Sequence, residues 1–389
     1  MTGPAADGRL RVAMLTREYP PDVYGGAGVH VEYLARSLAS LVDLTVHCEG
    51  ADRPGAIAHQ PWPHLSGANQ ALQVISAELS MVAATASADV VHSHTWYTSL
   101  AGHLSGLLHG IPHVLTAHSL EPLRPWKAEQ LGGGYAISSW SERTAIESAT
   151  AVVAVSRGMR ADILMTYPNV LPDRVHVIHN GIDAIQYSPD PDRDVLDRYG
   201  IDPSQPSVVF VGRVTRQKGL QVLLRAARHL QPEAQLVLCA GQADTAELQA
   251  EVSGLVDHLR ATRSGVIWIP GMLAKREVIQ ILSHATVFVC PSLYEPLGIV
   301  NLEAMACGTA VVASAVGGIP EVVEDGVTGL LVPPKDTQAL AAAINALIER
   351  PARAADFGAS GRARAVAEFS WEAVAARTAG LYASLAHDH

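Results

Sequence analysis

Short runs rich in Val, Ile and Leu alternate along the chain with longer segments whose apolar positions recur every three or four residues. Most of the short runs lack polar alternation, which is typical of parallel strands buried on both faces of a sheet. In the first half of the chain they predict strands at residues 10–15, 44–48, 90–92, 113–117, 151–155 and 175–178. Helices are predicted between them at residues 29–39, 71–86, 100–108, 135–148 and 158–167. This order predicts a parallel, doubly wound α/β sheet.

Two polar, proline-rich stretches, residues 188–194 and 202–206, interrupt the alternation and predict a domain boundary. Beyond them the pattern restarts, with strands at 208–211, 236–239, 266–269, 287–290, 310–313 and 330–332 and helices at 220–230, 246–262, 276–283, 299–306, 338–349 and 352–368. We therefore expect two tandem Rossmann-like domains facing a cleft, residues 9–190 and 205–368. A last amphipathic segment, residues 369–387, is expected to form a helix that packs back across the junction.

The composition excludes several classes of function. The 389 residues carry a net charge of -10, so nothing indicates binding to nucleic acid or to an anionic membrane. The four cysteines form no C-x-x-C pair and lie in apolar stretches, which favours a reduced, cytoplasmic protein. The longest charge-free apolar tract, residues 304–320, is broken by glycine and proline and cannot span a bilayer, and we expect no signal peptide.

The first candidate motif is the glycine-rich loop between the first predicted strand and helix, where Gly25 and Gly26 precede Ala27 and Gly28. Glycines let a backbone approach a phosphate closely, and the helix N-terminus that follows favours an anion. A nicotinamide fingerprint follows its strand at once, whereas nine residues intervene here, so we do not expect an oxidoreductase. The alternative is a turn without a ligand.

A second loop presents two cations, Arg213 and Lys218, directly after the strand at 208–211. Lys218 is followed by Gly219 rather than by Ser or Thr, so the loop is not a Walker A motif. An arginine fork and a lysine point charge at a strand end suit a diphosphate. The alternative is a solvated cationic turn.

The third motif begins at the end of the strand at 287–290 and is the most specific of the three. Glu295 lies in its loop, Gly298 opens a helix, and Glu303 follows inside that helix. Free N–H groups at the helix start can face an anion, and the two carboxylates can hold hydroxyls on either side of it. The alternative is a pair of solvated surface carboxylates, which the flanking apolar residues disfavour.

These motifs together resemble the glycogen-synthase-like group of retaining glycosyltransferases with two Rossmann domains, most closely its actinobacterial members. The likeness is carried by Gly25–Gly26, Arg213, Lys218, Glu295 and Glu303, and by the segments 17–21, 25–30, 92–97, 116–135 and 295–308. It runs from about residue 11 to about residue 385, and the block from Thr116 is highly specific. The resemblance implies the B-type glycosyltransferase fold, ADP-glucose as the donor and an α-1,4 linkage in the product.

The same resemblance implies a role for each site residue. Arg213 and Lys218 would bind the donor diphosphate, Glu295 the transferred glucose and Glu303 the ribose. Donor binding would also involve Gly25 and Gly26, Leu273, and the backbone N–H groups of Gly298, Ile299 and Val300. His118, which follows the carboxyl end of a predicted strand, would contact the sugar near its reacting face. The alternative is a buried core histidine whose hydrogen bonds are made within the fold. The residues expected to be catalytic are His118, Arg213, Lys218 and Glu295.

Two patterns typical of metal sites do not lead us to expect a metal. His92 and His94 have ligand-type spacing but no carboxylate or cysteine beside them in sequence. Asp190 and Asp192 lie in the proline-rich stretch and follow no strand. Since two cations and a helix N-terminus already face the diphosphate, we expect neither a metal nor another cofactor.

The expected acceptor-binding residues are Arg124, Trp126 and Lys127, which follow His118 closely. Two cations beside an indole suit a phosphorylated sugar, so we expect glucose-1-phosphate as acceptor, maltose-1-phosphate as product, and glycogen as a poorer acceptor. The alternative for this segment is a loop pinned by salt bridges to Glu121 or Glu129. The alternatives for the chain are a synthase that elongates glucan, transfer to another acceptor, and a catalytically silent protein that binds sugar nucleotide or glucan. The nucleobase and the oligomeric state stay open.

Overall fold

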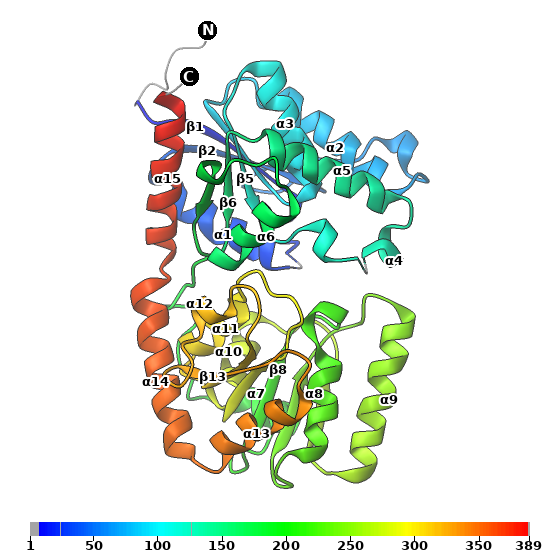
Figure 1. Ribbon diagram of the computed structural model, residues 1–389, viewed down its shortest axis with the longest axis vertical. Helices are drawn as coiled ribbons and strands as arrows, with labels where there is room; N and C mark the ends of the chain where they lie inside the picture. The colour runs from blue at the N-terminus through cyan, green and yellow to red at the C-terminus, as the bar shows by residue number, and fades with distance from the viewer. Residues whose placement is uncertain (1–7, 24, 126, 388–389) are drawn as a thin grey trace. The chain divides into compact units, whose positions relative to one another are not determined.

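The computed structural model describes residues 8–23, 25–125 and 127–387 and forms two compact units (Figure 1). One unit comprises Met1–Gly181 with Trp371–His389, and the other comprises Ile182–Ser370. Each is built around one parallel sheet with helices on both faces, so the predicted α/β class with two Rossmann-like domains is confirmed.

The first unit contains a seven-stranded parallel sheet in the order β3-β2-β1-β4-β5-β6-β7. Its strands are β1 (Arg11–Thr16), β2 (Asp43–Glu49), β3 (Ile57–His59), β4 (Val90–His94), β5 (His113–Ala117), β6 (Ala151–Ala154) and β7 (Val175–Val177). Its helices are α1 (Gly26–Leu38), α2 (Gln70–Ala84), α3 (Trp96–His109), α4 (Lys127–Leu131), α5 (Gly134–Ser148), α6 (Arg157–Thr166) and α15 (Trp371–His387), with 3-10 turns at Pro63–Leu65, Glu121–Leu123 and Pro172–Arg174.

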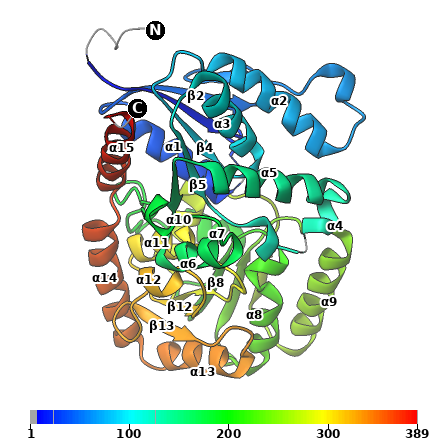
Figure 2. The ribbon, with the colours of Figure 1, turned by 45° about the horizontal axis from the view of Figure 1, so that its top comes forward.

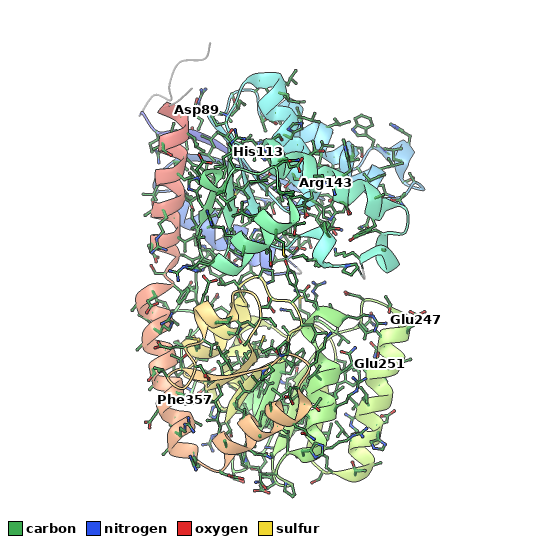
Figure 3. The ribbon with its side chains drawn as sticks, viewed as in Figure 1. Asp89, His113, Arg143, Glu247, Glu251 and Phe357 are labelled. Atoms are coloured by element: carbon green, nitrogen blue, oxygen red, sulfur yellow. The ribbon has the colours of Figure 1, made fainter. Side chains whose placement is uncertain are left out.

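Alternation along β1 explains how this sheet buries both of its faces. Val12 and Met14 pack in the core that α1 and α15 cover, whereas Ala13 and Leu15 pack in the core with residues of α2 and α3. Helix α15 lies along α1 (Figures 1 and 2). At the amino ends of the strands, the Asp89 carboxylate accepts a hydrogen bond of 2.8 Å from the Arg11 backbone N–H (Figure 3).

The second unit contains a six-stranded parallel sheet in the order β10-β9-β8-β11-β12-β13. Its strands are β8 (Ser207–Val211), β9 (Gln235–Cys239), β10 (Val266–Ile269), β11 (Val287–Cys290), β12 (Val311–Ser314) and β13 (Gly329–Val332). Its helices are α7 (Asp194–Tyr199), α8 (Leu220–Ala226), α9 (Ala246–Thr262), α10 (Lys275–Ser283), α11 (Ile299–Ala306), α12 (Ile319–Val322), α13 (Thr337–Ile348) and α14 (Pro351–Glu368), with 3-10 turns at Arg216–Lys218 and Ala227–His229.

The unit boundary differs from the expected one at residue 190, because the chain enters the second unit at Ile182. The proline-rich stretch is not a free linker. The Asp190 N–H donates to Ser283 Oγ at 3.0 Å, and the Val195 N–H donates to Gln280 Oε1 at 2.7 Å. These bonds attach the stretch to α10, and residues 194–199 form α7. The final helix, expected to pack back across the junction, belongs to the first unit.

The strand order reverses between β1 and β4 in the first sheet and between β8 and β11 in the second. Open α/β sheets bind ligands beyond the carboxyl ends of their strands at such a reversal. The glycine-rich loop follows β1, the Arg213–Lys218 loop follows β8, and the Glu295 loop follows β11. Among the described residues, none of the helices has both the length and the apolar character needed to cross a membrane.

Candidate active site

Lys218 and Glu295 meet beyond the second sheet, from the loops that follow β8 and β11. The Lys218 ammonium donates to Glu295 Oε2 at 2.7 Å, and the Ser292 hydroxyl donates to the same oxygen at 3.0 Å. Burial lowers the pKa of Lys218, but the charge of Glu295 and this hydrogen bond more than offset it, so the pKa is raised. Lys218 is therefore held as a cation at a fixed place.

Two glycines let the backbone around this pair close up. Gly219 has a φ of +64°, and a Cβ there would lie 2.1 Å from the carbonyl oxygen of Pro291. A Cβ on Gly317 would lie 2.0 Å from the carbonyl oxygen of Glu295, which accepts the Gly318 N–H at 3.0 Å. Both loops are thus fixed by backbone contacts that side chains would prevent.

The start of α11 has the geometry of an anion-facing helix end. Gly298, its N-cap, has a φ of +93°, a left-handed conformation that favours glycine. Ile299 and Val300 open the helix, and the first N–H groups of a helix lack partners within it. Glu303 is buried, which raises its pKa, while a hydrogen bond from Tyr187 and the charges of Lys275 and Lys218 oppose the shift.

Two other predicted donor residues, Arg213 and Leu273, are less buried than Glu295. Arg213 is 58% exposed, and its Nη1 lies 3.8 Å from Asp244 Oδ1. Leu273 is half-buried in the loop between β10 and α10. Arg213 can therefore reorient toward a ligand at little cost to the fold.

In the first unit, the glycine-rich loop is organised by Glu18. The Glu18 Oε2 atom accepts the Gly25 N–H at 2.8 Å, and a Cβ on Gly28 would lie 2.6 Å from that oxygen. Helix α1 begins at Gly26. The first donor of the loop is thus used by a carboxylate that the sequence does not lead us to expect, and Gly26 opens the helix next to it.

His118 belongs to a cluster of imidazoles at the ends of β4 and β5, in which His30 and His94 are buried and His118 is partly buried. Its Nε2 lies 3.0 Å from Nδ1 of His94, and its ring lies 4.7 Å from that of His30 between centroids. His30 Nδ1 is 2.7 Å from Asn180 Oδ1, so this nitrogen carries the proton. Burial lowers the pKa of His30 to about 4 and keeps those of His94 and His118 well below the usual value. All three rings are neutral near pH 7.

The histidines that could hold a metal ion are His30, His94 and His118, so His92 of the pair with ligand-type spacing is not among them. One ring nitrogen from each of His30, His94 and His118 lies within 4.8 Å of the others. His92 uses both nitrogens, at 2.6 Å from the Tyr382 hydroxyl and 2.7 Å from the Thr116 hydroxyl. An ion bound to the three would have to displace the proton that His94 and His118 share.

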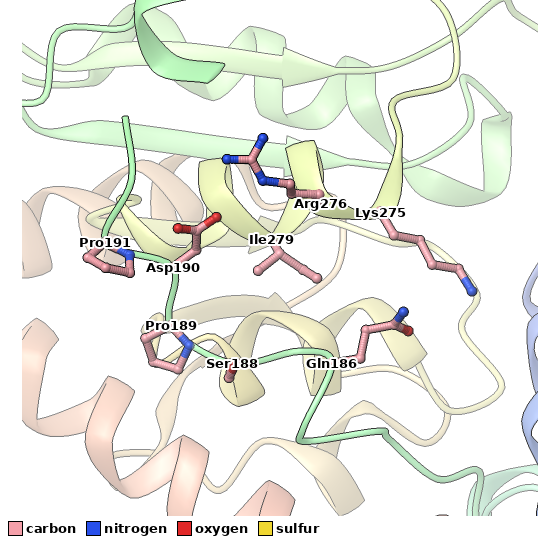
Figure 4. A pocket seen from close by; sticks show the side chains of 8 residues that line it. All are labelled: Gln186, Ser188, Pro189, Asp190, Pro191, Lys275, Arg276 and Ile279. Carbon is pink, nitrogen blue, oxygen red and sulfur yellow. The ribbon is translucent and has the colours of Figure 1, made fainter. Parts of the chain in front are cut away.

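In the second metal-like pattern, Asp190 and Asp192, the first aspartate lines a pocket of the second unit (Figure 4). The Gln280 amide donates to Asp190 at 3.2 Å, and the Arg276 guanidinium pairs with Asp192 at 3.4 Å. These carboxylates serve to attach the proline-rich stretch to α10. The pocket is lined by Gln186, Ser188, Pro189, Asp190, Pro191, Lys275, Arg276 and Ile279.

The expected acceptor residues fall into three situations. Arg124 donates to the buried Glu121 carboxylate at 2.7 Å, which is the pinned loop that the sequence left as an alternative. The Lys127 ammonium lies 5.7 Å from the centre of the Tyr97 ring. Trp126 lies outside the described residues. Arg124 is thus held in place by an ion pair, and Lys127 lies beside an aromatic ring.

Several residues at these sites escape the sequence-based reasoning. Ser292 lies inside the third motif but gives no signal apart from its place near Glu295. Arg17, whose Cζ lies 4.1 Å from the centre of the Tyr97 ring, directly follows β1. The signal that could have identified Arg17 and Tyr97 is their position at the carboxyl ends of β1 and β4, where the strand order reverses.

Comparison with known families assigns a model to each unit. A model described as "Glycosyltransferase Family 4" matches residues 24–186, and one described as "Glycosyl transferases group 1" matches residues 193–364. Among solved structures, sucrose-phosphate synthase from Thermosynechococcus elongatus matches with a TM-score of 0.83 and 26% identity, over 98% of this chain and all of its own.

Several relatives match nearly the whole chain. An alpha-maltose-1-phosphate synthase of Mycolicibacterium smegmatis is 60% identical over 96% of this chain and 99% of its own length. A glycogen synthase of Mycobacterium tuberculosis is 29% identical over 96% of this chain and 94% of its own length.

Proposed function

Because this chain belongs to the glycosyltransferase family that contains the alpha-maltose-1-phosphate synthases, and is therefore a hexosyltransferase, we propose that it transfers glucose from ADP-glucose to glucose-1-phosphate. The product is α-maltose-1-phosphate, a building block for α-glucan. The observation that supports this reaction best is the 60% identity to an alpha-maltose-1-phosphate synthase along almost the full length of both chains.

In this proposal the second unit binds the donor. Lys218 and Arg213 interact with the diphosphate, and the Lys218–Glu295 contact of 2.7 Å supports a shared site for diphosphate and glucose. Glu295 contacts the transferred glucose, and the buried Glu303 holds the ribose hydroxyls. The proposal also assigns donor binding to Leu273 and to the backbone of residues 298–300, and in the first unit to Gly25 and Gly26.

The proposed mechanism retains the configuration at the anomeric carbon. The bond between C1 of glucose and the diphosphate oxygen breaks, and a bond between C1 and the 4-hydroxyl oxygen of the acceptor forms on the same face. The leaving phosphate takes the hydroxyl proton, so ADP leaves and no carboxylate nucleophile is needed, unlike in most retaining glycosidases. Lys218 and Arg213 stabilise the charge that develops on the diphosphate, and His118 is assigned a contact to the sugar near its reacting face.

A second candidate acceptor is a glucan end, favoured by the 29% identity to a glycogen synthase. The two reactions share a donor and differ in the acceptor, which is charged in one case and neutral in the other. The cationic residues Arg17 and Lys127 of the first unit support the charged acceptor, whereas Arg124 is paired with the buried Glu121. A cytoplasmic location belongs to the same proposal and rests on four buried free cysteines, Cys48, Cys239, Cys290 and Cys307.

A panel of donors and acceptors tests the proposal. The protein is incubated with ADP-glucose or UDP-glucose, each with glucose-1-phosphate, inositol phosphate, glycogen or no acceptor, and nucleoside diphosphate release is measured. We expect release only with an acceptor, with ADP-glucose and glucose-1-phosphate as the best pair by kcat/KM. Absence of acceptor-dependent release from every donor would instead support a catalytically silent binding protein.

A further inference from the structure

Two cations share one aromatic ring in the first unit. The Arg17 Cζ lies 4.1 Å from the centre of the Tyr97 ring, and the Lys127 Nζ lies 5.7 Å from the same centre. Cations placed over a tyrosine ring are stabilised by it, but like charges brought to one ring repel each other. An anion bound between them would relieve that repulsion.

The three residues come from separate segments that the topology brings to one place. Arg17 directly follows β1, Tyr97 lies in the first turn of α3 after β4, and Lys127 begins α4. Strands β1 and β4 are neighbours in the sheet, at the point where its order reverses. Strand β4 ends at His94, so Arg17, Tyr97 and Lys127 lie at the same edge of the sheet as the imidazole cluster. Ligands of open α/β sheets bind at this edge.

Arg17 and Arg124 differ in the ion pairs that they make. Arg124 is 13% exposed and donates at 2.7 Å to Glu121, which is 1% exposed, so its charge is neutralised within the fold. Arg17 is 33% exposed, and its Nε lies 3.6 Å from Glu49 Oε2. A guanidinium has five N–H donors in a planar fork. Arg17 can therefore keep its contact to Glu49 through one edge and offer others to a ligand.

We propose that Arg17 and Lys127, positioned by the ring of Tyr97, bind the phosphate of the acceptor sugar and select a phosphorylated acceptor over a glucan end. The inference rests on the proposed function and refines its acceptor site. Arg17 supplies the planar fork and Lys127 the point charge, the two modes in which proteins bind phosphate. Arg124 is a positioning residue that fixes the turn before α4 through Glu121.

The test measures acceptor kinetics in single variants of the full chain. Arg17→Gln and Lys127→Gln should each raise the KM for glucose-1-phosphate about 10- to 100-fold, as expected for a lost hydrogen bond to a charged group. The KM for ADP-glucose and the rate of extension of maltoheptaose, a neutral glucan, should stay within about twofold. Arg17→Lys, which keeps the charge, should recover part of the affinity.

A matched control is available on α1. Arg36 also lies over a tyrosine ring, with its Cζ 5.1 Å from the centre of Tyr33, and it pairs with Glu32. Arg36→Gln removes the same kind of contact away from the strand ends and should leave the KM for glucose-1-phosphate unchanged. An unchanged KM in Arg17→Gln, or an equal rise in Arg36→Gln, overturns the inference while the proposed function stands. Failure of the parent enzyme to use glucose-1-phosphate overturns both.

Discussion

Removing the Lys218 ammonium should affect catalysis and stability together. Lys218 donates at 2.7 Å to a glutamate whose side chain is 8% exposed, while Lys218 itself is 21% exposed. Breaking a buried ion pair leaves an uncompensated charge and costs about 3–5 kcal/mol, and the partial exposure of Lys218 places this case near about 3 kcal/mol. For a unit of this size, about 3 kcal/mol lowers Tm by roughly 6–12 °C. Loss of a charge stabiliser at the diphosphate should lower kcat by about 10²-fold or more.

A double variant separates the two effects. In Lys218→Ala with Glu295→Gln, the orphaned charge is gone, so most of the lost Tm should return, whereas activity should stay as low as in Lys218→Ala or fall further. Arg213→Ala is the control, because an exposed pair at 3.8 Å is worth at most about 1 kcal/mol. It should lose about 10²-fold in rate with little change in Tm.

The assay combines initial rates of ADP release at saturating acceptor with thermal unfolding of the same preparations. Near-normal turnover in Lys218→Ala would refute its assignment to the diphosphate. A double variant as unstable as Lys218→Ala would show that the stability loss comes from packing of the lysine side chain and not from the charge of Glu295.

Further predictions concern metal ions, the ribose site and pH. Activity should survive EDTA, and a loss that Mn²⁺ or Mg²⁺ restores would contradict the proposed diphosphate site. Glu303→Gln should raise the KM for ADP-glucose by about tenfold and leave that for glucose-1-phosphate unchanged, which steady-state kinetics with each substrate varied in turn would show. Burial depresses the pKa of His30 to about 4, so the folded state binds fewer protons than the unfolded state between about pH 4 and pH 6.5. The free energy of unfolding should therefore fall as the pH drops through this range, by about 1.4 kcal/mol per pH unit for such a group. His30→Gln should reduce that slope in denaturant titrations, and an unchanged slope would mean that His30 is protonated in the folded state.

Sequence patterns define the buried elements of this fold well. The strands at 113–117 and 287–290 are predicted at their observed bounds, because continuous apolar runs are typical of strands covered on both faces. The edge strand at 266–269 also has its expected bounds, although most of it is only partly buried. Strand β3 escapes prediction because it is only 3 residues long and its first residue, Ile57, is 47% exposed. The short helices α4 and α7 escape for a similar reason, since neither spans enough turns to show a period.

In the candidate site too, the sequence marks some residues, whereas other contacts arise only from the fold. Lys218 and Glu295 are marked by their positions in loops after strand ends, and the structure brings these two side chains together, while their roles stay predictions. The sequence does not mark Ser292, which donates to Glu295, or Glu18, which accepts the Gly25 N–H, because these contacts depend on local geometry that composition does not encode. Arg17 and Tyr97 are far apart in sequence, and only the adjacency of β1 and β4 brings them together.

The most direct test of the proposed reaction is to identify its product. The protein is incubated with ADP-glucose and α-glucose-1-phosphate in equal amounts with glycogen, and the mixture is followed by ³¹P and ¹H nuclear magnetic resonance. Our account predicts α-maltose-1-phosphate with a new α-1,4 linkage, formed with a higher kcat/KM than glycogen extension. Extension of glycogen without any maltose-1-phosphate would contradict the account and identify the chain as a polymer-elongating synthase.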